Sequence, residues 1–194
     1  MPTLSTLEWF LIILLLIPTL YAMVKGAPFV PTPMPQVRRM LSAANLKPGM
    51  VVYDLGAGDG RLVHTAAKLY KAKAIGYELS PVVWAWSIVL SCFWWSSAKL
   101  RFGNFWTKDI SDADVIVCYL LPPAMENLKK KLLPQLKPGA LLVSHAFEIP
   151  GWKAHKCLER NREEKLAPVW IYRIEEEKPL RARKASPSRA KKSR

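Results

Sequence analysis

Residues 51–61 read VVYDLGAGDGR, and this stretch decides the fold of the 194-residue chain. An apolar strand pattern over 51–55 is followed by three closely spaced glycines (Gly56, Gly58, Gly60), and an amphipathic helical pattern starts at Arg61. In open α/β sheets, ligands bind at the carboxyl ends of the strands, commonly at the first strand-to-helix turn. Glycines there allow positive φ and a close approach of the ligand to the backbone. The loop 54–60 is therefore the predicted binding site.

Acidic side chains around this loop indicate the kind of ligand. Asp54 precedes the glycines, Asp59 lies among them, and Glu78 ends the next apolar strand. The spacing Gly-x-Gly-x-Gly differs from the dinucleotide fingerprint Gly-x-Gly-x-x-Gly, and carboxylates repel a pyrophosphate. A ligand with an ammonium and a sulfonium group is attracted instead, and a strand-end Glu accepts hydrogen bonds from a ribose diol. The pattern predicts an S-adenosylmethionine site; a nicotinamide dinucleotide site and a plain glycine corner are the alternatives.

Beyond the loop, short apolar strands alternate with helical patterns. Strands are expected at 51–55, 72–78, 99–103, 114–121, 140–147 and 169–175, and helices at 36–45, 61–70, 81–95 and 123–136. Nearly continuous apolar strands in such an alternation are typical of a buried, mostly parallel sheet. The expected fold class is α/β, with helices on both faces of the sheet.

Several short motifs resemble one enzyme family. Asp54–Gly60 is similar to motif I of class I methyltransferases, and Gly76-Tyr77-Glu78 to the acidic motif that follows it. Pro28-Phe29-Val30-Pro31-Thr32 and Pro123-x-Met125-x-x-Leu128-x-x-Lys131-Leu132 resemble the membrane-anchored protein-lysine methyltransferases that modify the mitochondrial adenine nucleotide translocase and ATP synthase c-subunit. The resemblance covers roughly residues 8–175. It implies a Rossmann-like class I methyltransferase sheet, S-adenosylmethionine as cofactor, and methyl transfer to a lysine ε-amine of a membrane protein.

The resemblance also implies site residues. The expected cofactor contacts are Asp54, Gly56, Ala57, Gly58, Asp59, Gly60, Glu78, Asn104 and Phe105. Asn104 stands where the family more often has Asp, and its amide still pairs with adenine. Phe29, Val30 and Thr32 would cap the methyl donor, unless the proline-rich segment is a stiff spacer. Leu120 and Pro122 are expected in the substrate entry wall after the fourth strand. Tyr119 and Thr32 are the expected catalytic residues; simple packing is the alternative for Tyr119.

The cysteines and histidines do not indicate a metal site or a disulfide. The three cysteines (Cys92, Cys118, Cys157) have no metal or disulfide spacing, and Cys118 is expected in the core. The three histidines are scattered, so no metal site is expected. His64 is expected at the surface. His145, at the end of a strand, is expected in the core or at the site.

The amino-terminal segment carries no charge from Trp9 to Val24. Residues 7–24 are predicted to form a transmembrane anchor, with a cleaved signal peptide as the alternative. Because Lys25, Arg38 and Arg39 follow the anchor and no basic residue precedes it, the catalytic domain is expected in the cytoplasm of a single-pass membrane protein. Residues 25–50 are expected to form a proline-rich linker and a helix, and 51–177 the methyltransferase domain.

Two further stretches have an unusual composition. Leu79–Ala98 carries no charge and contains four tryptophans, which suggests a helix lying on the bilayer surface; burial in an oligomer or under the amino-terminal segment is the alternative. The tail 178–194 has eight basic and no acidic residues, within a net charge of +14, and is expected to be disordered. Its positive charge would attract it to anionic lipid. Nucleic acid is not an expected partner, because the tail has no aromatic residue for base stacking.

The sequence leaves alternative functions open. A lipid headgroup, a small molecule or RNA are alternative methyl acceptors. Outside enzymes, a non-catalytic membrane scaffold is the alternative, although the intact Asp54, Gly56, Gly58 and Glu78 favour an enzyme.

Overall fold

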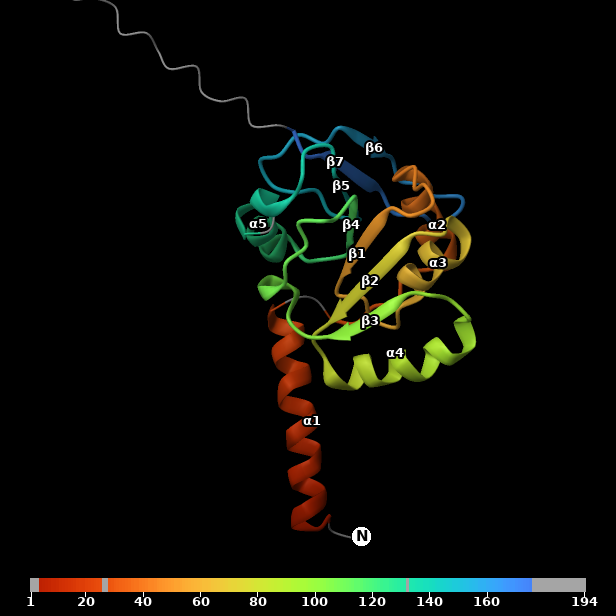
Figure 1. Ribbon diagram of the computed structural model, residues 1–194. Coiled ribbons are helices and arrows are strands. Elements are labelled where there is room, and N and C mark those ends of the chain that lie inside the picture. The colour runs from red at the N-terminus through yellow and green to blue at the C-terminus, as the bar shows by residue number, and fades with distance from the viewer. Residues whose placement is uncertain (1–3, 26–27, 132, 176–194) are drawn as a thin grey trace, which may run out of the picture.

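The computed structural model describes residues 4–25, 28–131 and 133–175, and its centre is a seven-stranded sheet (Figure 1). The strands are β1 Val51–Leu55, β2 Lys73–Glu78, β3 Lys99–Phe102, β4 Val115–Cys118, β5 Leu141–His145, β6 Lys156–Leu158 and β7 Val169–Arg173. Their order is β3-β2-β1-β4-β5-β7-β6. The first five strands are parallel to their neighbours, whereas β7 is antiparallel to both β5 and β6. The predicted mostly parallel α/β sheet is confirmed.

Helices cover both faces of this sheet. Helices α2 Met34–Ala43 and α3 Arg61–Tyr70 pack on one face, and α5 Pro122–Lys131 packs on the other. The other described helices are α1 Thr6–Lys25 and α4 Pro81–Trp94, and 3-10 turns lie at Phe105–Thr107 and Leu133–Gln135. Strand side chains alternate between two buried clusters: Val52 packs with α2 and α3, and Leu55 packs with α5 on the other face. The two clusters hold the strand ends in place, and these ends carry the predicted site.

Some element boundaries differ from the sequence prediction. The expected strand 114–121 ends at Cys118, because α5 already starts at Pro122, where proline is tolerated in a first helical turn. The expected helix 123–136 ends at Lys131. Strand β6 was not predicted at all, since its three residues are too few for a period-two pattern to be recognised.

His64 lies in the interior, so its predicted place at the surface is wrong. Only 1% of the residue is exposed. Its Nδ1 and Nε2 lie 2.7 Å and 2.9 Å from the hydroxyls of Ser96 and Ser91, and its ring stacks on Trp94 at 5.3 Å. Burial lowers the pKa of this imidazole. His64 therefore fastens α3 to the carboxyl-terminal end of α4.

Helix α1 projects away from the domain (Figure 1). Every residue from Trp9 to Ile17 is large, apolar and at least 40% exposed. Among the residues that the structure describes, no helix meets the length and hydropathy required of a membrane span, so the predicted transmembrane anchor is not confirmed. The predicted basic tail 178–194 lies outside the described residues.

Candidate active site

The glycine loop between β1 and α3 has the backbone that its sequence requires. Gly56, Gly58 and Gly60 have φ values of 86°, 57° and 81°, a region that side chains with a Cβ rarely occupy. The amides of Gly56 and Ala57 donate to the carbonyl of Tyr77 at 3.0 Å and 2.9 Å. These bonds hold the loop against the end of β2.

Glu78 braces the same loop from the end of β2. Its Oε2 accepts a hydrogen bond from the Gly58 amide at 2.9 Å, and its Oε1 accepts one from the Ser80 amide at 2.8 Å. Both bonds are buried. The carboxylate is therefore fixed in orientation at the pocket wall, which suits a residue that accepts hydrogen bonds from a ligand.

Asp59 has a basic partner that the sequence analysis did not assign. Arg61 forms a salt bridge to Asp59 at 2.6 Å, and its other terminal nitrogen donates to the carbonyl of Thr32 at 2.9 Å. The charge of Asp59 is thus offset within the protein. The same guanidinium ties the segment 28–32 to the glycine loop.

Asp54 is a buried carboxyl that lines the pocket. Only 6% of the residue is exposed, and burial raises its pKa well above the usual value; the charges of Glu78 and Asp59 raise it further. A buried acid of this kind gains from a cation beside it, because the cation offsets both desolvation and repulsion. A ligand with an ammonium and a sulfonium group fits this environment.

A pocket of about 140 Å³ joins these groups. Among its lining residues are predicted ones from the loop, from β2 and from the segment 28–32: Asp54, Gly56, Ala57, Gly58, Asp59, Glu78, Phe29, Val30 and Thr32. Phe105, Tyr119 and Leu120 line it as well. The structure therefore brings twelve of the fifteen predicted residues together.

The other three predicted residues, Gly60, Asn104 and Pro122, are not among the lining residues. Gly60 is the N-cap of α3, and Pro122 is the first residue of α5. The Asn104 side-chain oxygen accepts a hydrogen bond from the Trp106 amide at 3.0 Å, so it caps the 3-10 turn Phe105–Thr107. The predicted adenine contact of Asn104 through its amide stays a prediction.

Phe29 lies directly over the glycine loop. A Cβ added at Gly58 would come within 2.7 Å of the Phe29 ring, so the loop and the aromatic ring are in close contact. Phe29 lines the pocket and is 43% exposed, so its ring lies between the glycine loop and solvent.

Tyr119 lines the pocket and belongs to a group of aromatic rings. Its ring meets His145 edge-on at 4.2 Å and lies nearly parallel to Phe147 at 6.2 Å. His145 is only 6% exposed, its Nδ1 has no hydrogen-bond partner in the part of the chain that the structure describes, and burial lowers its pKa to about 4. The imidazole is therefore neutral at physiological pH. Cys118, next to Tyr119, is fully buried as expected, and burial raises the pKa of its thiol to about 12.

Several lining residues were not predicted. They include Thr19 of α1, Met40 of α2, Arg61 and Leu62 of α3, Ser80 and Val83 around the start of α4, and Trp106. Most of them come from helices far apart in the sequence, so no local motif marks them. Arg61 is the exception, because it directly follows the glycine loop.

Comparison with known proteins now decides the family. Residues 54–156 match the ANTKMT methyltransferase domain. The chain belongs to this family. It is 40% identical to a protein-lysine N-methyltransferase of Saccharolobus islandicus over 158 residues, which are 80% of this chain and 98% of that protein. It is 32% identical over 151 residues to the mouse lysine N-methyltransferase of the ATP synthase c-subunit; the match spans 75% of this chain and 57% of that protein.

A solved structure agrees with this assignment. The RNA methyltransferase of Salinibacter ruber, in complex with S-adenosyl-L-homocysteine, superimposes with a TM-score of 0.71 at 35% identity, covering 78% of this chain and 97% of that one. The predicted class, an S-adenosylmethionine-dependent methyltransferase of the protein-lysine type with a Rossmann-like sheet, is confirmed. The alternative of a non-catalytic membrane scaffold is not supported.

Proposed function

We propose that this enzyme methylates the ε-amine of a lysine in a membrane protein. The observation that carries the proposal is the position of the pocket. Asp54 and Glu78 line it, and so does Thr19 of the exposed apolar helix α1. An acceptor that reaches the pocket therefore passes the base of a helix suited to an apolar layer. Relatives that act on the ATP synthase c-subunit and on adenine nucleotide translocase support the same substrate class.

Different residues of the pocket would bind the cofactor and exclude water. S-adenosylmethionine supplies a methyl group on a positively charged sulfur. Asp54 would neutralise the ammonium group of the cofactor, and Glu78 would accept hydrogen bonds from its ribose hydroxyls. The segment 28–32, tied down by Arg61, would exclude water over the reacting atoms. These contacts orient the cofactor, which is the main catalytic contribution in an in-line displacement.

The acceptor lysine must arrive without its proton. Tyr119 lines the pocket and packs against the rings of His145 and Phe147, and desolvation beside this aromatic group would lower the pKa of an entering ammonium. The expected roles of Tyr119 in contacting the amine and of Thr32, Val30 and Leu120 in lining its path are part of this proposal. The charge bias after α1 supports a catalytic domain on the cytoplasmic side of the membrane.

The test is a transfer experiment with the full chain. Purified enzyme and S-adenosylmethionine labelled in its methyl group are added to membranes from a strain that lacks the enzyme. We expect label in protein, at a lysine identified by mass spectrometry. Label only in lipid or only in RNA would overturn the proposal, and the RNA result would match the activity named for the Salinibacter ruber protein.

A further inference from the structure

Helix α4 presents an apolar face that the domain does not cover. Ser87 is its only buried residue. The exposed side chains include Trp86 at 54% and Phe93 at 76%, and Trp95, just beyond the helix, is 87% exposed. Val82, Ile88 and Val89 extend this face along the helix. We define these six residues as the α4 face. An exposed patch of this kind marks an interaction site, because leaving it in water is unfavourable.

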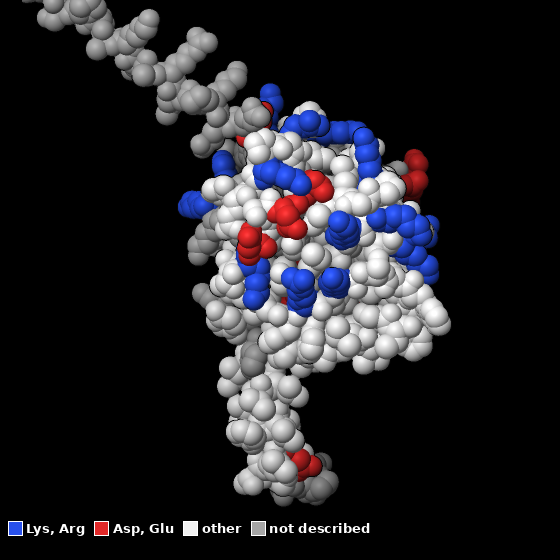
Figure 2. Space-filling view, viewed as in Figure 1, with Lys and Arg blue, Asp and Glu red and all other residues white. Residues whose placement is uncertain are grey.

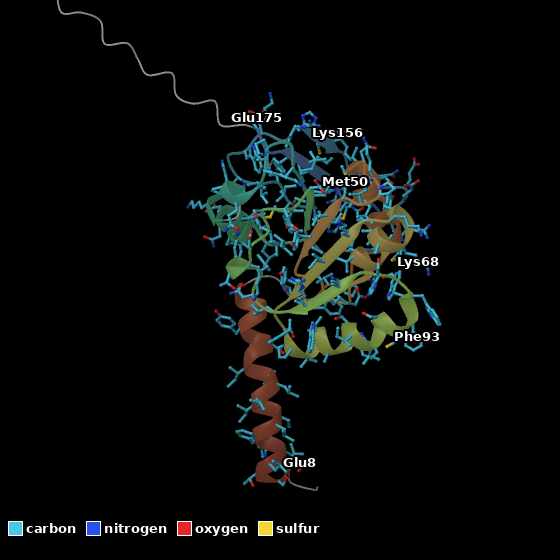
Figure 3. The ribbon with its side chains drawn as sticks, viewed as in Figure 1. Glu8, Met50, Lys68, Phe93, Lys156 and Glu175 are labelled. Atoms are coloured by element: carbon cyan, nitrogen blue, oxygen red, sulfur yellow. The ribbon has the colours of Figure 1, made fainter. Side chains whose placement is uncertain are left out.

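The α4 face is continuous with the apolar surface of α1. The hydroxyls of Thr19 and Ser80 lie 3.3 Å apart, at the junction of the two helices. In Figure 1, α1 points away from the domain while α4 runs crosswise at the base of the domain, so the two helices form an L. Figure 2 shows no charged side chain over either arm on this side, apart from acidic atoms at the far end of α1, where Figure 3 labels Glu8.

The shape of this surface favours a lipid layer as its occupant. Consecutive residues 9–17 of α1 are all exposed and apolar, and consecutive helical residues point about 100° apart. The apolar surface therefore surrounds α1, whereas a protein groove covers only one stripe of a helix. A lipid layer around α1 would have its surface near the end of α1 that joins the domain. Helix α4 runs crosswise at that level (Figure 1).

Basic side chains lie where the headgroups of such a layer would be. Lys68 donates a hydrogen bond to the Trp94 carbonyl at 3.3 Å, at the end of α4, and Figure 3 shows Lys68 above Phe93. Lys99 and Arg101 are exposed on β3, the strand that packs against α4. Leu79–Ala98 has no charge of either sign. Tryptophan rings next to basic side chains are the composition of a membrane–water interface with anionic lipids.

We propose that the α4 face lies in the interface of a lipid bilayer with anionic headgroups, with α1 embedded in the same bilayer. This contact turns the pocket, which Thr19, Ser80 and Val83 line at the junction of α1 and α4, toward the membrane surface. Resting on the proposed function, it specifies the substrate class further: lysines just outside the apolar layer, on segments that emerge from it. Orientation of this kind also raises the effective concentration of such lysines at the pocket.

The test uses a fluorescent label on Cys92, which is exposed on α4. The full-length Cys157→Ser protein is labelled and incorporated into phosphatidylcholine vesicles that contain phosphatidylglycerol. Cys118 stays unlabelled, because it is buried and its thiol has a pKa of about 12. The matched control carries Cys92→Ser, Cys157→Ser and Lys156→Cys, which places the label at the end of the domain opposite to α4 (Figure 3).

We expect loss of iodide quenching at position 92 in vesicles, with a blue-shifted emission, while the label at position 156 stays quenched. Equal quenching of both labels would overturn the proposal. So would protection at position 92 that disappears when the protein is diluted to one copy per vesicle, because a second copy would then be the occupant.

A second variant connects the contact with activity. Phe93→Ser with Trp95→Ser should restore quenching at position 92 and lower methyl transfer to vesicle-embedded substrates, while S-adenosylhomocysteine binds as before. If lysine transfer is absent in the unaltered enzyme but position 92 is protected, the proposed function fails and the membrane contact stands. If lysine transfer occurs but position 92 is not protected, the membrane contact is rejected and the proposed function stands.

Discussion

Asp54→Asn should make the ligand-free enzyme more stable and its cofactor binding weaker. The substitution keeps the shape of the side chain and removes its charge. In the folded protein the pKa of Asp54 is raised well above its usual value, first by burial and then by Glu78 and Asp59. Ionised Asp54 therefore opposes folding, and the amide does not.

The sign of the pH dependence follows from that shift. An unfolded chain ionises Asp54 near pH 4, whereas the folded protein does so at higher pH. The stabilisation by the protonated form is present below about pH 4 and is lost as the pH rises to the folded pKa. Each pKa unit corresponds to about 1.4 kcal/mol, and about 1 kcal/mol moves Tm by roughly 2–4 °C in a protein of this size. We expect the Tm of the variant to be at least a few degrees above that of the parent at pH 7. At pH 4 the two Tm values should differ little.

Ligand binding should change in the opposite direction. A hydrogen bond to a charged group contributes about 1.5–3 kcal/mol, which is roughly a 10- to 150-fold change in Kd. Calorimetric titration with S-adenosylhomocysteine and thermal unfolding over a pH series measure both effects. The matched control is Asp109→Asn, an exposed Asp away from the lining residues. A variant that is no more stable than the parent at pH 7, or that binds as tightly, would refute the electrostatic argument.

Three other substitutions examine separate parts of the site. Glu78→Gln should weaken S-adenosylhomocysteine binding by roughly 10- to 150-fold in a titration, since it removes the charge of the proposed ribose acceptor; unchanged affinity would contradict that role. Gly76→Ala would place its Cβ 2.5 Å from the Ala57 Cβ, and such overpacking costs about 1–3 kcal/mol, so Tm should fall by roughly 2–12 °C. Tyr119→Ala should lower kcat by about 100-fold in a lysine-peptide assay while S-adenosylhomocysteine affinity is kept; equal losses in both would make Tyr119 a structural residue.

The sequence was sufficient to predict the sheet and the glycine loop, because both depend on local signals. Continuous apolar runs are typical of the buried strands of a parallel sheet. Gly56 and Gly58 have a positive φ, which glycine adopts readily because it has no side chain. The carboxylates were identified for the same reason. Their different partners were not, since Asp59 pairs with Arg61 whereas burial raises the pKa of Asp54, and only three-dimensional contacts distinguish the two residues.

Contacts between distant segments account for what sequence reasoning missed. His64 is polar and has few apolar neighbours in the helical pattern, yet two serines from the α4 region satisfy both its ring nitrogens in the interior. Thr19 lines the pocket because the carboxyl-terminal end of α1 meets the start of α4, where Thr19 contacts Ser80. Neither residue has a local signature.

Ser80 connects the proposed cofactor site with the junction of α1 and α4. Its amide donates to Glu78 at the pocket wall, and its hydroxyl caps α4 by accepting from the Val83 amide at 3.3 Å. The same hydroxyl meets Thr19 of α1. A shift of α4 relative to α1 therefore moves a residue bonded to the carboxylate that braces Gly58. Because these bonds are partly or fully buried, the orientation of the two helices and the geometry of the cofactor loop cannot vary independently.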